Sequence, residues 1–248
     1  MSNPEPLNTG TLVIIPTYNE SDNISVVIPI VMELPGNLSV LVVDDGSPDG
    51  TAENVRRLAR NYPGRISILE RADKQGLGTA YLEGFQYALE HGFEMVCEMD
   101  ADRSHDPRDL PRIIEPVASG AADLVIGSRY IDGVRIMNWP LSRLVLSYGA
   151  GIYTRVITRL PVQDVTSGYK CIHRRVLEAI PFERVRSNGY SFQIEINYRA
   201  WRRNFRIREV PIVFTERREG DSKMSKAIVR EAMFKVWELR LRAIFGKL

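Results

Sequence analysis

Residues 11–20 (TLVIIPTYNE) and 40–51 (VLVVDDGSPDGT) decide the fold, because each is a short apolar run that stops in a polar cluster. Uninterrupted apolar runs of this length are typical of strands that are covered on both faces of a sheet. The second cluster, residues 44–50, consists of residue types that favour turns. Each segment is followed by a helical pattern, so the chain begins with two strand–loop–helix units.

The same alternation continues along the chain. It predicts strands at Thr11–Ile15, Val40–Val43, Ile66–Leu69, Glu94–Met99, Asp123–Ile126, Ile207–Val210 and Ile212–Thr215. It predicts helices at Asn23–Leu34, Thr51–Asn61, Gly78–His91, Leu110–Ala118, Leu141–Leu160, Val176–Ile180 and Phe192–Trp201. Pro29 is expected to interrupt the first of these helices or to mark a boundary. Strand–helix alternation predicts an α/β fold with a Rossmann-like, mostly parallel sheet flanked by helices.

Composition excludes several classes of protein. Of the 248 residues, 44% are hydrophobic and 26% charged, which excludes disordered, collagen-like and disulfide-scaffold chains. The 33 basic and 31 acidic residues nearly cancel, so net charge does not favour nucleic acid as a partner. The apolar runs are much shorter than the about 20 residues of a membrane-spanning helix. With two cysteines far apart and no signal peptide, we expect a reducing, cytosolic setting.

Three polar clusters follow predicted strands, at Pro16–Glu20, Asp44–Gly50 and Asp100–Asp102. Ligands of open parallel sheets bind beyond the carboxyl ends of the strands, so these clusters mark a candidate site. Asp100 and Asp102 can share a hard divalent cation that bridges the phosphates of a nucleotide. An isolated pair of this kind is more often a solvated turn, and Asp49 can simply cap a helix. The convergence of three clusters on one edge favours a ligand site.

Other motifs carry less weight. No G-x-x-x-x-G-K-[ST] phosphate loop is present, and Gly76-Leu77-Gly78 is expected to start a helix rather than bind a dinucleotide. The histidines at 91, 105 and 173 lack metal-ligand spacing, although His105 is near the Asp pair in sequence. Cys97 and Met99 are expected in the core.

Five motifs together resemble family 2 glycosyltransferases: residues 11–20, VVDDGSPDGT at 42–51, DAD at 100–102, GSRY at 127–130 and DVTSG at 164–168. They occur in the order of that family and extend the resemblance to about residue 225. Within the family, the chain is most similar to the dolichol-phosphate (polyprenol-phosphate) mannose synthases. The resemblance implies a GT-A fold and an inverting, metal-dependent transfer of mannose from GDP-mannose to a polyprenyl phosphate.

The resemblance also implies roles for single residues on the donor side. The nucleotide pocket would be lined by Pro16, Tyr18, Glu20, Val43 and Asp45, with Asp45 facing the base. Asp100 and Asp102 would hold Mg²⁺ or Mn²⁺ on the diphosphate, and Ala101 would line the site. Relatives often carry Gln where this chain has Ser104, which is a shorter potential metal ligand.

On the acceptor side, Arg129, Arg143 and Ser147 would receive the phosphate of the lipid. Arg217 and Lys223 would close over the donor phosphates. Catalysis would thus depend on Asp102, Arg129, Arg217 and Lys223. Relatives often carry Lys where this chain has Asn188, which removes one possible phosphate contact.

We expect one domain over residues 1–248, because no repeat or linker divides the chain. Residues 10–130 would form the nucleotide-sugar half, 131–222 the acceptor half and 223–248 a basic amphipathic helix. This last segment has seven Lys or Arg against two Glu, interleaved with apolar residues. Such a helix can lie in a membrane interface, pack on the core or dock on a membrane-embedded partner protein. We therefore expect a peripheral protein on the cytoplasmic face of a membrane.

Alternatives remain open at this point. The donor could be UDP-glucose, or the acceptor a glycan hydroxyl, although a hydroxyl acceptor needs a base and no residue is clearly assigned to that role. A nucleotidyltransferase would normally have a glycine- and lysine-rich phosphate loop near its N-terminus, which residues 16–20 are not. A non-catalytic sugar-nucleotide binding module is disfavoured because the metal and phosphate residues are all present.

Overall fold

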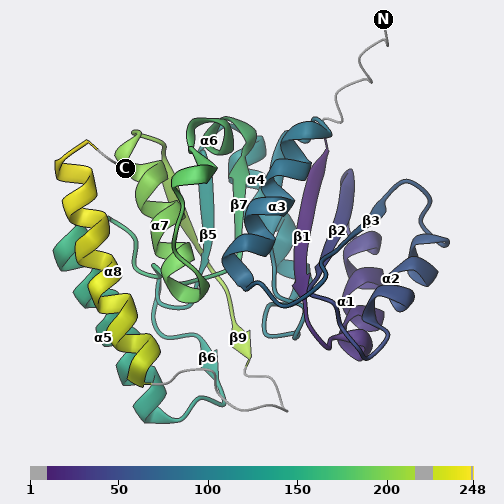
Figure 1. The fold of residues 1–248 in the computed structure, drawn as a ribbon, viewed down its shortest axis with the longest axis horizontal. Helices are drawn as coiled ribbons and strands as arrows, with labels where there is room; N and C mark the ends of the chain where they lie inside the picture. The colour runs from purple at the N-terminus through teal and green to yellow at the C-terminus, as the bar shows by residue number, and fades with distance from the viewer. Residues whose placement is uncertain (1–9, 216–225, 247) are drawn as a thin grey trace, which may run out of the picture.

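A mostly parallel sheet runs through the middle of the computed structural model, which describes residues 10–215, 226–246 and 248 (Figure 1). Its strands lie in the order β3-β2-β1-β4-β7-β5-β8, and only β7 runs antiparallel to its two neighbours. The strands are β1 (Thr11–Thr17), β2 (Leu38–Asp44), β3 (Ile66–Glu70), β4 (Met95–Glu98), β5 (Leu124–Ser128), β7 (Lys170–His173) and β8 (Ile207–Pro211). The predicted α/β fold with a mostly parallel sheet is confirmed.

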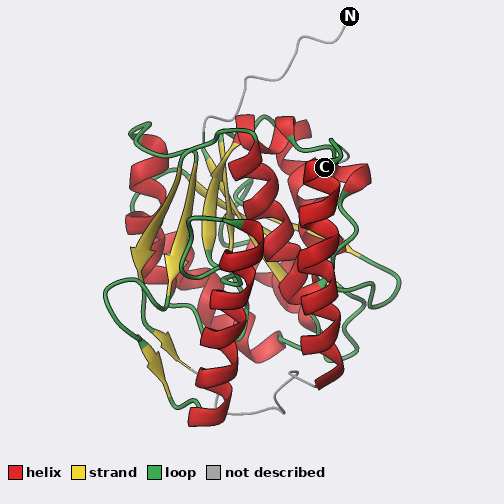
Figure 2. Cartoon of the chain, turned by 90° about the vertical axis from the view of Figure 1, so that its left-hand side faces the viewer, coloured by secondary structure: helices red, strands yellow, loops and turns green. Residues whose placement is uncertain are grey.

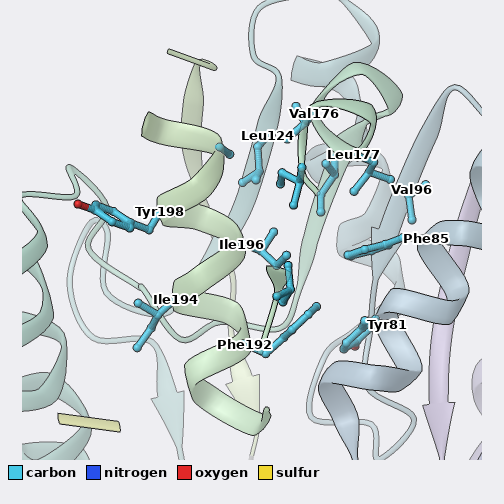
Figure 3. Close-up of a cluster of buried hydrophobic side chains, with 14 of the residues drawn as sticks. Tyr81, Phe85, Val96, Leu124, Val176, Leu177, Phe192, Ile194, Ile196 and Tyr198 are labelled. Carbon is cyan, nitrogen blue, oxygen red and sulfur yellow. The ribbon is translucent and has the colours of Figure 1, made fainter. Parts of the chain in front are cut away.

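Helices cover both faces of this sheet, because successive strand residues point to opposite sides. Leu12 and Ile14 face a core that includes residues of α3 (Leu77–Glu90), α6 (Arg174–Ala179) and α7 (Gly189–Arg202). Figure 3 shows the centre of this core, where the rings of Tyr81 on α3 and Phe192 on α7 stack with centroids 5.9 Å apart.

The opposite face of the sheet packs against three other helices. Val13 and Ile15 of β1 belong to this second core. It is covered by α1 (Ser21–Glu33), α2 (Thr51–Ala59) and α4 (Leu110–Ala118). Two short 3₁₀ helices, η1 (Pro107–Asp109) and η2 (Phe182–Arg184), complete the connections.

Two further long helices complete the fold, and one of them joins the first core through Val236, Leu239 and Ala243. Helices α5 (Leu141–Thr158) and α8 (Lys226–Ile244) lie side by side at one side of the molecule (Figures 1 and 2). Near the start of α5, β6 (Ile136–Met137) pairs with β9 (Phe214–Thr215) to form a small separate sheet.

The structure corrects three sequence expectations. Helix α1 continues through Pro29, because burial of Ile28 and Val31 on either side outweighs the cost of about 3 kcal/mol for proline inside a helix. The strand expected at Ile212–Thr215 shortens to β9, which leaves the main sheet to pair with β6. Strands β6 and β7 were not predicted at all.

The apolar pattern of the sequence does not reveal β7, because this strand contains a fully buried lysine. Lys170 lies opposite Glu98 of β4 in the strand register, and both side chains are 0% exposed. The Lys170 Nζ atom donates to Asn197 Oδ1 (3.0 Å), and Gln193 Nε2 donates to Glu98 Oε2 (2.6 Å). Burial raises the pKa of Glu98, while the charge of Lys170 opposes that shift. This polar cluster fastens α7 to the centre of the sheet.

Candidate active site

The three polar clusters meet at one edge of the sheet. The parallel register pairs Thr17 at the end of β1 with Asp44 at the end of β2, and it pairs Ile14 with Glu98 at the end of β4. The loops that leave these strands therefore start from neighbouring positions, at the lower edge of the sheet in Figure 1. The sequence expectation of a shared edge is confirmed.

The loop after β1 is fastened to the loop after β2. Thr17 donates to Asp44 Oδ1 (2.7 Å), and the backbone N–H of Asn19 donates to Ser47 Oγ (2.9 Å). The Glu20 backbone N–H donates to Thr51 Oγ1 (3.1 Å). Between these anchors the Tyr18 side chain is 39% exposed, with the Lys74 ammonium 4.1 Å from its ring centroid. These contacts leave Tyr18 accessible to a ligand at the edge.

Asp49 acts as a cap, as one interpretation of the sequence allowed. Its carboxylate accepts from the backbone N–H of Thr51 at the start of α2 (3.0 Å). It also accepts from the backbone N–H of Ser21 at the start of α1 (3.0 Å). Hydrogen bonds from Thr51 and Ser21 lower the pKa of Asp49 despite the opposing effect of burial.

Asp45 forms a buried ion pair with Arg71, a residue that the sequence analysis missed. Arg71 Nε donates to Asp45 Oδ1 (2.6 Å), and the Arg71 side chain is 3% exposed. The same guanidinium donates to Thr79 Oγ1 (2.7 Å) and to the Gly76 carbonyl (3.1 Å). Arg71 directly follows β3, so the rule that selected the other three clusters would also have selected it. The pair fixes the orientation of the Asp45 carboxylate.

Asp100 and Asp102 follow β4, and His105 forms a hydrogen bond with the backbone of Asp100. Asp100 donates its backbone N–H to His105 Nδ1 (3.3 Å), and its own side chain is 37% exposed. The His105 ring is buried between Tyr169, at 4.7 Å between centroids, and Phe214, at 5.5 Å. Burial lowers the pKa of His105 to about 4, so the ring is neutral at neutral pH. These contacts indicate that His105 supports the loop that carries the two carboxylates.

The oxygen atoms of Asp100, Asp102 and Ser104 are of the type that coordinates a hard divalent cation. The Ser104 backbone N–H donates to Asp102 Oδ1 (3.0 Å), while Ser104 Oγ is buried with no hydrogen-bond partner in the described part of the chain. Residues 10–215 and 226–246 contain no cluster of three or more His, Cys, Asp or Glu that could hold a metal by itself. Mg²⁺ commonly uses one or two carboxylates and completes its shell with water and substrate phosphates, so the two carboxylates fit that mode.

The DVTSG segment (residues 164–168) packs near both the carboxylate pair and Arg129. Ser167 Oγ donates to the Gly127 carbonyl (2.6 Å). A Cβ atom added to Gly168 would lie 3.5 Å from Gln193 Nε2 and 3.9 Å from Asp100 Oδ1. Asp164 is fully buried against Arg129. The segment therefore contacts Arg129 and lies near Asp100, so it connects the two groups of predicted residues.

Arg129 is engaged within the protein. Its Nε and Nη2 atoms donate to the two Asp164 carboxylate oxygens (2.7 and 2.6 Å), and Nη2 also donates to Thr166 Oγ1 (2.9 Å). Burial alone would lower the pKa of Arg129, but the charge of Asp164 outweighs it and raises the pKa. Rings of Tyr130 and Phe214 lie 5.5 and 5.4 Å from the guanidinium carbon. A role in binding a phosphate stays a prediction for Arg129.

Arg143 and Ser147 are four residues apart on α5 and connect to the same aromatic cluster. The Arg143 guanidinium carbon lies 4.2 Å from the Trp139 ring centroid. Ser147 Oγ accepts from the Tyr130 hydroxyl (2.8 Å). Through Trp139 and Tyr130, Arg129, Arg143 and Ser147 are connected, and their role in binding a lipid phosphate stays a prediction.

Of the remaining predicted residues, Val43 and Ala101 are buried beneath the edge and Pro16 is half-buried. Arg217 and Lys223 lie outside the described residues. Asn188 joins two helices, because its Oδ1 accepts from the backbone N–H of Gly78 at the start of α3 and of Gly189 at the start of α7 (2.8 Å each). Asn188 thus has a structural role that its sequence position did not indicate.

Comparison with known proteins gives consistent results. The sequence model described as Glycosyl transferase family 2 matches residues 12–180. A polyprenol monophosphomannose synthase of Mycolicibacterium smegmatis is 48% identical over 232 residues, which cover 94% of this chain and 87% of that protein. An undecaprenyl-phosphate mannosyltransferase of Micrococcus luteus is 43% identical over 233 residues, covering 93% and 95%.

Among solved structures, glucosyl-3-phosphoglycerate synthase of Mycobacterium tuberculosis, in complex with Mn²⁺, UDP and phosphoglyceric acid, has the same fold. The TM-score is 0.72 at 19% identity, covering 94% of this chain and 79% of that one. A second complex of that enzyme, with Mn²⁺, UDP-glucose and phosphoglyceric acid, gives a TM-score of 0.71 at 18% identity over 94% and 80%. At this level of identity the likeness concerns the fold alone.

The Arg129–Asp164 pair yields a stability prediction. Asp164→Ala leaves a buried guanidinium without its carboxylate and should lower the free energy of unfolding by about 3–5 kcal/mol. The double variant Arg129→Met with Asp164→Leu removes both charges and should lose much less. Urea unfolding followed by circular dichroism measures both.

Glu53→Ala is the matched control, because it removes an exposed partner 3.6 Å from Arg56 and should leave stability nearly unchanged. An Asp164→Ala protein as stable as the wild type would show that the buried pair does not support the fold.

Proposed function

We propose, from the premise that this chain belongs to glycosyl transferase family 2, that it transfers mannose from GDP-mannose to a polyprenyl phosphate. The strongest support is the similarity to the polyprenol monophosphomannose synthase (48% identity) and the undecaprenyl-phosphate mannosyltransferase (43% identity). Each alignment covers most of this chain and most of the relative. The side chains at the sheet edge fit that chemistry in three parts: a base pocket, a carboxylate pair and a group of arginines.

The base pocket would be built on Asp45, with Pro16, Tyr18, Glu20 and Val43 around it. Arg71 holds one Asp45 oxygen, so the carboxylate keeps a fixed direction from which it can accept hydrogen bonds from the edge of a base. Tyr18, whose side chain is partly exposed with Lys74 over its ring, follows the neighbouring strand β1 at the same edge. Because the Asp45 carboxylate is already oriented, less entropy is lost in ordering the site when a nucleotide binds.

Asp100 and Asp102 would hold Mg²⁺ or Mn²⁺ against the donor diphosphate, and Ser104 Oγ is a further oxygen in the same loop. When bound, such a cation supplies Lewis-acid stabilisation of the departing diphosphate. His105 supports the loop by accepting the Asp100 backbone N–H. Arg217 and Lys223, by sequence position, would add positive charge over the same phosphates.

Arg129, Arg143 and Ser147 would hold the phosphate of the lipid acceptor. A phosphate oxygen is already anionic at neutral pH, so it can attack the anomeric carbon of the sugar without a dedicated base. As that carbon–oxygen bond forms, the bond to the nucleoside diphosphate breaks and the diphosphate leaves with the electron pair. Catalysis would then rest on positioning and on stabilisation of negative charge. In-line displacement would convert an α-linked donor into a β-linked sugar phosphate.

The lipid acceptor requires contact with a membrane, and we assign that contact to α5 and α8. No helix among residues 10–215 and 226–246 is long and apolar enough to cross a bilayer. The two helices nevertheless expose large apolar side chains, with Val145 and Val156 63% and 73% exposed on α5 and Phe234 and Trp237 72% and 50% exposed on α8.

Charge on these helices favours the same assignment. The α5 sequence contains Arg143 and Arg155 and no acidic residue, and Glu238 of α8 is paired with Lys235 (2.9 Å). Paired amphipathic helices with more basic than acidic residues suit the interface of an anionic bilayer. We therefore propose peripheral attachment to the cytoplasmic face of a membrane, with docking on a membrane-embedded protein as the alternative.

Product analysis tests the proposed reaction. Purified protein with Mg²⁺ or Mn²⁺, a polyprenyl phosphate and GDP-mannose should yield a polyprenyl-phospho-hexose by mass spectrometry. A parallel reaction with UDP-glucose should yield none, and a chelator should abolish the product.

Product from UDP-glucose alone would keep the acceptor and replace the donor. Absence of any lipid-linked hexose with either donor, under conditions in which the protein binds a sugar nucleotide, would overturn the polyprenyl phosphate assignment.

Vesicle co-sedimentation tests the membrane surface. The wild type should sediment with phosphatidylcholine vesicles containing phosphatidylglycerol, and replacing Phe234 and Trp237 by Ser should release it several-fold, because their apolar area no longer enters the bilayer. Val26→Ser, which changes a 43% exposed side chain on α1, is the matched control. Equal binding of all three proteins would place the contact elsewhere.

A further inference from the structure

Trp139 lies between the two arginines of the acceptor site. It immediately precedes Pro140, the N-cap residue of α5. Its ring centroid is 4.2 Å from the guanidinium carbon of Arg143 and 5.6 Å from that of Arg129. Aromatic faces attract cations over such distances, so the indole ring helps to fix Arg143 beside Arg129.

The polar atom of the same ring lacks a hydrogen-bond partner in the described part of the chain. Trp139 Nε1 is buried and has no hydrogen-bond partner among the residues that the structure describes. A buried N–H is normally paired, because leaving it unpaired costs the free energy of its desolvation. The indole N–H is a donor only, so the missing partner must be an acceptor.

The surroundings select the kind of acceptor. The Arg129 and Arg143 guanidinium groups give the site positive charge, and the nearby Asp164 carboxylate is already bonded by Arg129. The ring cannot easily turn toward another partner, because the Phe214 ring packs against it at 5.6 Å with an interplanar angle of 73°. A ligand oxygen that carries negative charge satisfies both the arginines and the indole.

We propose that Trp139 binds the acceptor phosphate, with its indole N–H donating to a phosphate oxygen and its ring face holding Arg143 in position. This assignment rests on the proposed function, since it takes the phosphate of the lipid acceptor as the ligand. It adds a neutral donor to a site for which the sequence motifs indicated only Arg129, Arg143 and Ser147.

Two substitutions separate the roles of the N–H and of the ring. Trp139→Phe keeps an aromatic face but loses the donor, whereas Trp139→Leu loses both. Trp201→Phe is the matched control, because Trp201 lies in the last turn of α7 near Tyr198 (centroids 5.9 Å apart) and is remote in sequence from the acceptor residues. Calorimetric titration with farnesyl phosphate, in the absence of donor, measures the acceptor phosphate alone, and titration with GDP-mannose measures the donor.

Trp139→Phe should weaken farnesyl phosphate binding about tenfold, or about 1.4 kcal/mol, because a hydrogen bond to a charged group is lost. Trp139→Leu should weaken it further. Affinity for GDP-mannose should stay unchanged in both, and Trp201→Phe should alter neither affinity. In turnover, the loss should fall on the KM for the acceptor rather than on that for the donor.

Unchanged farnesyl phosphate binding in Trp139→Phe would overturn the assignment of the N–H while leaving the proposed function intact. Equal losses for donor and acceptor, together with a lower melting temperature, would show that Trp139 only supports the fold. A wild-type protein that binds GDP-mannose but no prenyl phosphate would contradict the proposed function itself.

Discussion

The site depends on one geometric constraint: neighbouring parallel strands end at the same edge of a sheet. Strands β2, β1 and β4 are buried and mostly apolar, and a polar cluster follows the carboxyl end of each. The register sets Thr17 beside Asp44, and it aligns β4 so that Asp100 and Asp102 emerge next to them. Residues from three distant parts of the sequence become neighbours because the strands do.

Buried charges then join this edge to the acceptor side. The Glu98–Lys170 cluster fixes antiparallel β7 in the sheet, and the Arg129–Asp164 pair fixes the loop that precedes β7. Desolvated charges tolerate little change in geometry, because each must keep its partner. Phe214 links the two sides, because its ring contacts His105 near the carboxylate pair and Trp139 near Arg143. The residues proposed to bind the donor and the acceptor thus flank a single aromatic cluster.

Sequence patterns predicted most of the fold and much of the site, and the failures have physical causes. Apolar periodicity finds strands whose buried side chains are apolar, so it missed the short strand β7, where Lys170 is buried together with Cys171 and Ile172. Arg71 could have been predicted from its position after β3. Trp139 could not, because its significance arises from the contact of its ring with Arg143 and from packing against Phe214, which is distant in sequence. The role predicted for Arg217 rests on the family resemblance alone.

The central claim is that the edge of the sheet formed by β2, β1 and β4 binds the donor diphosphate through a cation on Asp100 and Asp102. Calorimetric titration of GDP-mannose into the wild type and into the double variant Asp100→Asn with Asp102→Asn, each with and without Mn²⁺, measures this directly. The account predicts tight binding only for the wild type with Mn²⁺. Equal affinity in all four titrations would contradict it.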